Sequence, residues 1–149
     1  MAMILLPTDF KDFLKLLNEN AVDYLLVGGY AVGHHGYPRA TGDMDVWIAR
    51  SEANSQKVAA ALRAFGFSSD DITVGVFLEA DRVVRMGNPP LRIELLTSIS
   101  GVEFADCWLR RETITMDDLP INVIDMDSLK INKQASGRLK DLNDLEHLT

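Results

Sequence analysis

Two aspartates separated by one residue, Asp43 and Asp45, lead into the apolar run Val46, Trp47 and Ile48. Side chains on a β-strand alternate between its two faces, so a strand over 43–48 places both carboxylates on one face. Two unpaired carboxylates 4 Å apart repel each other by about 4 kcal/mol at an effective dielectric constant of 20. A divalent cation removes that repulsion, and hard oxygen ligands select Mg²⁺ or Mn²⁺ over zinc. The pattern predicts a metal-binding pair, although on its own an Asp-x-Asp strand is also typical of a solvated face.

A glycine pair, Gly28 and Gly29, ends an earlier apolar run, and thirteen residues separate it from Asp43. Glycine has no Cβ, so a phosphate can approach the backbone N–H groups there closely. The helix expected directly after the pair adds a favourable dipole for an anion. The sequence therefore predicts a phosphate cradle beside the carboxylates; the alternative interpretation of the pair is a plain turn.

A third carboxylate is needed if two metal ions are to be held, and Glu94 is the best candidate. In its segment Leu91, Ile93 and Leu95 alternate with Arg92 and Glu94, so the two charged residues share a face of a predicted strand. Three carboxylates and a bound triphosphate leave a surplus of negative charge over two Mg²⁺ ions, which calls for basic side chains from another element. The competing third acids are Glu79 and Asp81.

The glycine pair, the spacer and the Asp-x-Asp motif together resemble the signature of the DNA polymerase β-type nucleotidyltransferase superfamily. A later carboxylate in an apolar strand belongs to the same pattern; Glu94 fills it, where the family often has Asp. Residues 87–97 resemble a segment of small stand-alone bacterial and archaeal nucleotidyltransferases, among them relatives of the AbiEii-type toxins. Residues 132–142 resemble the late Lys and Lys-Asp motifs of those toxins, so the resemblance spans roughly 25–145.

The resemblance implies a metal-dependent enzyme that transfers a nucleoside monophosphate from an NTP to an acceptor hydroxyl and releases pyrophosphate. Asp43 and Asp45 would bridge two Mg²⁺ ions, with Mn²⁺ as the alternative metal. Glu94 would hold the catalytic metal and assist deprotonation of the acceptor. Gly28 and Gly29 would hold the triphosphate, which makes the five residues the predicted catalytic, metal-binding and nucleotide-binding core.

Further nucleotide contacts are expected from a loop and from the tail. Thr41 and Arg39 precede the acids and either contact the γ-phosphate or the acceptor, or simply form a loop. On one continuous final helix, Lys133, Gly137 and Lys140 share a stripe opposite the apolar one, so both lysines can reach phosphate oxygens. The alternative for the two lysines is an ordinary solvated helix face.

Hydrophobic periodicity and turn residues predict the elements that position these residues. We expect helices from Thr8 to about 18–20, at 30–35, between Ser51 and Gly66, at 102–110, and from Asp127 to the end, with Ile131, Ala135, Leu139, Leu142 and Leu145 on one buried face. We expect strands at 24–27, 43–48, 72–77, 82–86, 91–96, 113–115 and 121–124. This order predicts a single α/β (α+β) domain over 1–149 with the polymerase β-like nucleotidyltransferase fold, a mixed central sheet flanked by helices.

Composition limits the class and the partners. The chain has 149 residues, a net charge of −7 and one cysteine, Cys107, which excludes an internal disulfide. No apolar run approaches the roughly 20 residues that span a bilayer, and the start lacks a basic signal-peptide region, so we predict a cytoplasmic protein without membrane contact. The negative charge disfavours tight, unaided binding of RNA. His34, His35 and His147 receive no functional role.

The predicted partners are an NTP and an acceptor whose identity stays open among a tRNA 3′ end, a protein hydroxyl and a small molecule such as an antibiotic. Larger relatives carry a further helical domain over the base, so we expect an open site here, or one closed by a second copy of the chain or by an antitoxin-like partner. The alternative from another class is a non-catalytic nucleotide-binding or toxin–antitoxin module of the same fold.

Overall fold

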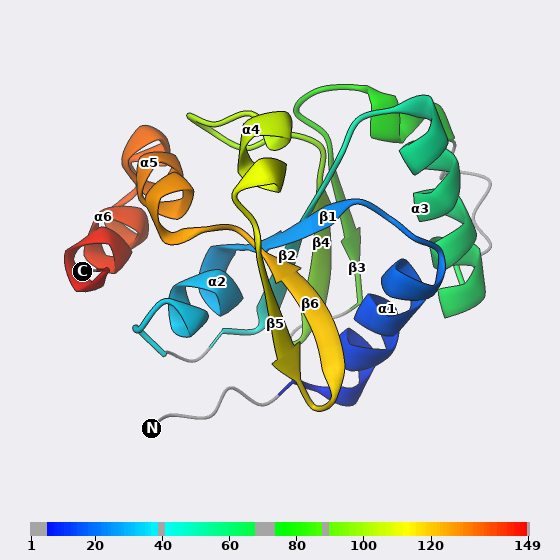
Figure 1. Cartoon of the computed structure of the whole chain (residues 1–149), viewed down its shortest axis with the longest axis horizontal. Helices are drawn as coiled ribbons and strands as arrows, with labels where there is room; N and C mark the ends of the chain where they lie inside the picture. Colours follow the sequence, from blue (N-terminus) through cyan, green and yellow to red (C-terminus); the bar gives the residue numbers. More distant parts are fainter. Residues whose placement is uncertain (1–5, 39–40, 68–73, 88–89, 149) are drawn as a thin grey trace.

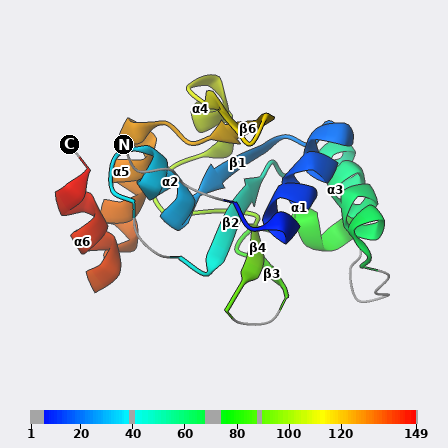
Figure 2. The ribbon, with the colours of Figure 1, turned by 90° about the horizontal axis from the view of Figure 1, so that it is seen from below.

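The computed structural model describes residues 6–38, 41–67, 74–87 and 90–148 and centres on a six-stranded mixed sheet with the order β3-β4-β2-β1-β6-β5. Its strands are β1 (Tyr24–Val27), β2 (Asp43–Ile48), β3 (Val83–Met86), β4 (Arg92–Leu96), β5 (Glu112–Met116) and β6 (Leu119–Val123). Helices α1 (Thr8–Glu19) and α3 (Glu52–Phe65) lie on one side of the sheet (Figures 1 and 2). On the other side lie α2 (Gly28–His34), α5 (Met126–Ser136) and α6 (Leu139–His147), while α4 (Phe104–Leu109) follows β4. The predicted mixed sheet flanked by helices is confirmed.

The central strands carry the core because each buries a nearly continuous apolar run. All four residues of β1 are buried, and on β2 Met44, Val46 and Ile48 are fully buried. Strand β1 runs antiparallel to β2 and parallel to β6, and β2 runs parallel to β4. Asp43, Asp45 and Trp47 alternate along β2 with these three buried residues, so their side chains point to the opposite face of the sheet. The predicted site residues of β2 lie on this second face.

Two helices form as their sequences predict. In α1 the residues spaced for one face are buried: Phe10, Phe13, Leu14 and Leu17. Ser51 caps α3 by accepting a hydrogen bond from the Asn54 N–H, and Gly66 ends it in the left-handed conformation at φ +111°. Both helices thus bury an apolar stripe, and they pack against each other on this side of the sheet.

The prediction of a strand over 72–77 is wrong for the residues that the structure describes, because Val74–Leu78 form a 3₁₀ helix, η1. Only Phe77 of that helix is fully buried, and Gly75 supplies no side chain to an apolar face. The run therefore lacks the alternate burial that a strand needs, and one large ring anchors it instead. Ile72 and Thr73 lie outside the described residues.

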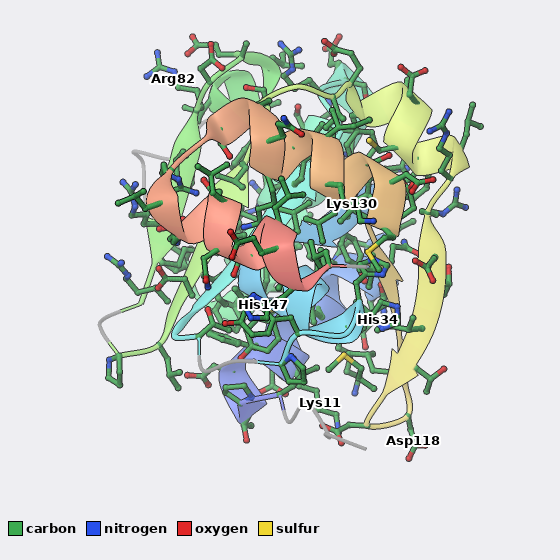
Figure 3. The ribbon with its side chains drawn as sticks, turned by 90° about the vertical axis from the view of Figure 1, so that its left-hand side faces the viewer. Lys11, His34, Arg82, Asp118, Lys130 and His147 are labelled. Carbon is green, nitrogen blue, oxygen red and sulfur yellow. The ribbon has the colours of Figure 1, made fainter. Side chains whose placement is uncertain are left out.

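The prediction of a single final helix is also wrong, because the tail forms two helices, α5 and α6, which are separated at Gly137. Gly137 has φ +64°, and its N–H bonds the Lys133 carbonyl, so it is the left-handed cap of α5 rather than a residue inside a helix. Asp125, and not Asp127, caps α5 through the Ser128 N–H. The predicted buried face accordingly breaks up: Leu139 is 87% exposed and Ile131 50% exposed. Figure 3 looks onto α5 and α6 as they cover this side of the molecule.

The break at Gly137 can be tested by the sign of the stability change that an alanine causes there. Replacing Gly137 with alanine is expected to destabilise the protein by about 1 kcal/mol, because a left-handed φ disfavours a Cβ, although the site has room for one. In one continuous helix the same substitution would stabilise by about the same amount. Chemical denaturation measures the difference, and Gly137→Asn, which tolerates the left-handed region, should stay near the wild type.

None of the helices in the described part of the chain is both long and apolar enough to cross a bilayer.

Candidate active site

Strands β2 and β4 bring the three predicted acids onto one face of the sheet. Asp45 pairs with Glu94 in the parallel register, and Asp43 pairs with Arg92 one step earlier. Because side chains alternate along both strands, these four charged groups project from the same side. The strand register therefore puts Asp43, Asp45 and Glu94 on one face of the sheet, and their shared ligation of a metal stays a prediction.

Asp45 occupies the most unusual environment of the three. Burial raises its pKa to about 7, and the charge of Glu94, a hydrogen bond between the two carboxyl groups and the charge of Asp43 add to the rise, while Lys140 opposes it. The Oδ1 atom of Asp45 is buried and has no hydrogen-bond partner among the described residues. A buried carboxylate oxygen with no partner has lost its hydration without replacement, and a bound cation would restore it.

Two arginines pair with the other two acids. Arg92 donates to both carboxylate oxygens of Asp43, at 3.2 and 3.4 Å, and Arg85 of β3 donates to Glu94 Oε1 at 3.0 Å. Because these contacts draw Asp43 and Glu94 toward the arginines, the three acids do not close into one tight cluster. Among the described residues, one set of three potential metal ligands has its ligand atoms all within 4.8 Å of one another: His34, His35 and Glu112.

Hydrogen bonds and ion pairs explain the cluster of His34, His35 and Glu112 without a metal ion. His35 Nε2 lies 2.7 Å from the Ile124 carbonyl oxygen and 3.5 Å from Glu112 Oε2, so a proton on this nitrogen serves both oxygens. His34 Nε2 lies 3.7 Å from Glu112 Oε1. These contacts fasten the end of α2 to β5 and to the residue after β6. The third histidine, His147, stacks on Tyr37 with ring centroids 3.9 Å apart.

The glycine pair lies directly against the acids. Gly28 has φ +65°, and a Cβ built on it would overlap Asp45 Oδ2. A Cβ on Gly29 would lie 2.9 Å from Thr41 Oγ1, which itself donates to the Asp43 carbonyl at 3.1 Å. Both glycines are therefore required for space, and Thr41 ties the loop to the strand that carries the acids. Arg39, predicted beside Thr41, lies outside the described residues.

Gly28→Ala tests this close approach. We expect a loss of about 2 kcal/mol or more of stability, because the new Cβ requires a left-handed φ and also displaces the Asp45 carboxylate. Urea denaturation of Gly28→Ala, Asp45→Ala and the double variant should give non-additive losses, with the alanine at 28 costing less once the carboxylate is gone. Strict additivity would contradict the contact.

All eight residues predicted for the site line one cavity of about 560 Å³, a volume within the roughly 300–1,000 Å³ usual for ligand sites. They are Gly28, Gly29, Thr41, Asp43, Asp45, Glu94, Lys133 and Lys140. The competing acids lie elsewhere: Glu79 pairs with Arg82 at 2.6 Å, and Asp81 accepts from Ser98 Oγ at 2.8 Å. Of the three candidates for the third acid, Glu94 is the one on the cavity wall.

The two predicted lysines occupy different positions. Lys140, at the start of α6, is exposed on the cavity wall close enough to affect the pKa of Asp45. Lys133 is 4% exposed, and its Nζ lies 3.2 Å from Asp141 Oδ1 and 3.1 Å from Asp144 Oδ2. The shared stripe predicted for both therefore does not form, because the helix breaks between them. Lys133 joins α5 to α6, and a nucleotide contact from it stays a prediction.

Two cations of the cavity were not assigned to the site from the sequence. Arg85 comes from β3, and Arg138, which also donates to Asp141 at 2.7 and 3.2 Å, comes from the junction of α5 and α6. Arg85 could have been found from the alternation of β3, since it shares the face of its partner Glu94. Arg138 had no such signal, because its position depends on the break at Gly137.

No family model matches the chain, and no curated protein matches it in sequence. Solved structures nevertheless match it over nearly its full length, and the matches define the nucleotidyltransferase fold. The lincosamide antibiotic adenylyltransferase LnuA, solved with lincomycin bound, is 15% identical with a TM-score of 0.61, covering 97% of this chain and 96% of its own.

Two further structures agree. A Thermotoga maritima protein assigned as a nucleotidyltransferase is 14% identical with a TM-score of 0.61, covering 97% of this chain and 92% of its own. An antigenic nucleotidyltransferase-like protein from Paracoccidioides brasiliensis is 16% identical with a TM-score of 0.55, covering 94% and 74%. None of these three is described as a toxin, so the AbiEii-like subtype stays a prediction.

Proposed function

We propose that this protein is a metal-dependent nucleotidyltransferase that moves a nucleoside monophosphate from an NTP to an acceptor hydroxyl. The observation that carries the proposal is the Asp45 carboxyl, which lies beside Glu94 and against Gly28 in one cavity and has a buried oxygen without a hydrogen-bond partner among the described residues. A structural aspartate would have its oxygens satisfied, whereas a ligand-binding one is left open for the ligand. The shared fold supports the same reaction class.

The donor set fits Mg²⁺ or Mn²⁺, because Asp43, Asp45 and Glu94 offer only hard carboxylate oxygens. When bound, the metal would neutralise negative charge on the attacking and leaving oxygens. The two arginines that hold Asp43 and Glu94 keep these acids compensated before a metal arrives. Asp45 has no such arginine among the described contacts, and its raised pKa lets it hold a proton in the same state.

The side chains around the acids fit a triphosphate. Arg85 from β3 and Arg138 and Lys140 from the start of α6 line the cavity, and Gly28 and Gly29 open the backbone to a phosphate. In the proposed reaction the acceptor oxygen forms a bond to the α-phosphorus, the bond from that phosphorus to the bridging oxygen breaks, and pyrophosphate leaves with that oxygen. In this proposal Glu94 takes the acceptor's proton, and its position beside Asp45 on the cavity wall supports that role.

The experiment that tests the proposal supplies each α-labelled NTP with Mg²⁺ to the protein together with fractionated RNA, protein and small metabolites. Labelling of one fraction is expected, and it should disappear with EDTA and return with excess Mg²⁺ or Mn²⁺. Calorimetry with a non-hydrolysable NTP analogue, with and without Mg²⁺, runs in parallel. Metal-dependent binding without labelling of any fraction would identify the non-catalytic nucleotide-binding module instead, and no binding would reject both.

The acceptor is proposed to be a small hydroxylated molecule in preference to a tRNA 3′ end or a protein. LnuA, which shares the fold, is an antibiotic adenylyltransferase solved with lincomycin bound. Lincomycin is accordingly the first acceptor to supply in the labelling reaction, beside total tRNA as the competing substrate.

A further inference from the structure

A second cavity of about 370 Å³ adjoins the candidate active site. Ser98, Ile99 and Ser100 line both cavities, so the segment after β4 forms a common wall between them. Trp47 also lines the second cavity. It lies two residues after Asp45 on β2, so its side chain is on the same face of the strand as Asp43 and Asp45. One such step is about 6–7 Å along a strand, so a molecule seated over Trp47 can present a hydroxyl group at Asp45.

The walls of this second cavity are aromatic and aliphatic. Trp47 and Phe104 pack edge to face with ring centroids 5.1 Å apart, and Ile99 and Val102 extend the apolar surface beside them. Aromatic side chains give a ligand a large apolar contact area with few rotatable bonds. The cavity therefore suits a compact body with an apolar face.

Trp47 also offers an unused hydrogen-bond donor. The side chain is 2% exposed, and its indole Nε1 has no acceptor among the described residues. Buried indole N–H groups usually have a partner. Trp47 lines the cavity, but this N–H is closed to solvent, so an oxygen of a bound molecule meets it only after the side chain shifts in the cavity wall.

The charges around the second cavity differ from those around the first. Among the described residues, Asp81 and Glu103 line it with one cation, Arg50, whereas Arg85, Arg138 and Lys140 line the first. A nucleic-acid end needs several basic groups to neutralise its phosphates, and one arginine between two acids does not provide them. A neutral molecule or an amine meets no such barrier, and an ammonium group gains from both carboxylates.

We propose that the second cavity, formed by Trp47, Phe104, Asp81 and Glu103, is the acceptor subsite, and that it takes a small hydroxylated amine with an apolar body rather than an RNA end. This inference rests on the proposed function, because only a nucleotidyl transfer makes the bound molecule an acceptor. The binding preference of the cavity can nevertheless be measured without any nucleotide or metal. The two ideas can therefore fail separately.

The test compares three aryl glucosides of similar size: 4-(aminomethyl)phenyl, 4-methylphenyl and 4-carboxyphenyl β-D-glucopyranoside. Calorimetry without NTP or Mg²⁺ should show the amine binding at least tenfold more tightly than the carboxylate, with the neutral compound between them. Asp81→Asn and Glu103→Gln should each weaken the amine about threefold and leave the neutral compound unchanged. Glu79→Gln removes a nearby charge outside the cavity, and so it is the matched control that should change nothing.

Trp47→Phe keeps a ring but removes the donor, and should weaken all three glucosides by a similar factor of about three to ten, with thermal melts confirming the fold. An RNA oligonucleotide ending in CCA should not displace the amine. The inference is overturned if none of the glucosides binds at millimolar concentration, if the carboxylate binds best, or if the RNA competes. If the amine binds as expected but no NTP analogue binds with Mg²⁺, the cavity stands and the proposed function falls.

Discussion

Asp45→Asn is expected to lower the rate of nucleotidyl transfer by about a thousandfold or more. The substitution keeps the size of the side chain but removes the negative charge that a metal needs, and several kcal/mol of charge stabilisation correspond to that factor. The rate of label transfer measures it, at saturating NTP and Mg²⁺. Asp12→Asn, an exposed aspartate of α1, is the control and should keep full activity. Transfer within tenfold of the wild type would remove Asp45 from the site.

The same variant should change stability in a pH-dependent way. The pKa of Asp45 is raised from 3.8 to about 7 in the folded protein. Between those values the folded chain keeps a proton that the unfolded chain has lost, so the free energy of unfolding falls as the pH rises from about 4 to about 7. The asparagine variant cannot titrate there. In the absence of metal it should therefore show a flatter profile and a higher free energy of unfolding at pH 8. A steeper profile in the variant would contradict the assignment.

Lys133→Ala is expected to lower the free energy of unfolding by about 3–5 kcal/mol, the usual cost of removing one partner from a buried ion pair. Asp141 is 0% exposed and Asp144 1% exposed, and both carboxylates contact the lysine. Burial raises the pKa of Asp141, but hydrogen bonds from Arg138, Lys133 and Ser136 outweigh it and lower that pKa to about 2. The stability that this carboxylate contributes is present above about pH 4 and is lost as the pH falls toward 2.

The control for this prediction is Lys130→Ala, which removes the same charge from a half-buried position on α5 (Figure 3). It should cost about 0.5 kcal/mol or less. Urea denaturation at pH 7 gives both numbers, and at pH 3 the gap between the two variants should narrow. Equal losses at pH 7 would mean that Lys133 is an ordinary surface lysine.

Local patterns were sufficient for the elements that bury a regular face. Tyr24–Val27 and Asp43–Ile48 form strands with the predicted bounds, because continuous or alternating apolar residues leave one way to bury them. The same alternation placed Asp43, Asp45, Arg92 and Glu94 on one face, and the pairing of β2 with β4 brought the two sets together. The site's acidic floor could thus be predicted from strand periodicity and the family resemblance.

The tail could not be predicted in the same way. Leucines at helical spacing continue across Gly137, so periodicity alone favours one helix, yet the interactions that decide the outcome are long-range and polar. Lys133 finds Asp141 and Asp144 only when the chain turns back between them. The pairing of Arg92 with Asp43, forty-nine positions apart, is equally invisible without the sheet register. Sequence reasoning consequently predicted the acids that line the cavity but not Arg85 and Arg138, which line it with them.

Under the proposed function, the bend at Gly137 would link nucleotide recognition to the integrity of the C-terminal region. Arg138 and Lys140 follow the bend and line the cavity, and Lys133, which joins α5 to α6, is enclosed beside them on the wall of the same cavity. Damage to that enclosed junction would displace two cationic groups at once without touching either of them. Variants far from the reacting atoms should accordingly alter KM for the nucleotide before they unfold the protein, and selection for affinity would also preserve the geometry of the last two helices.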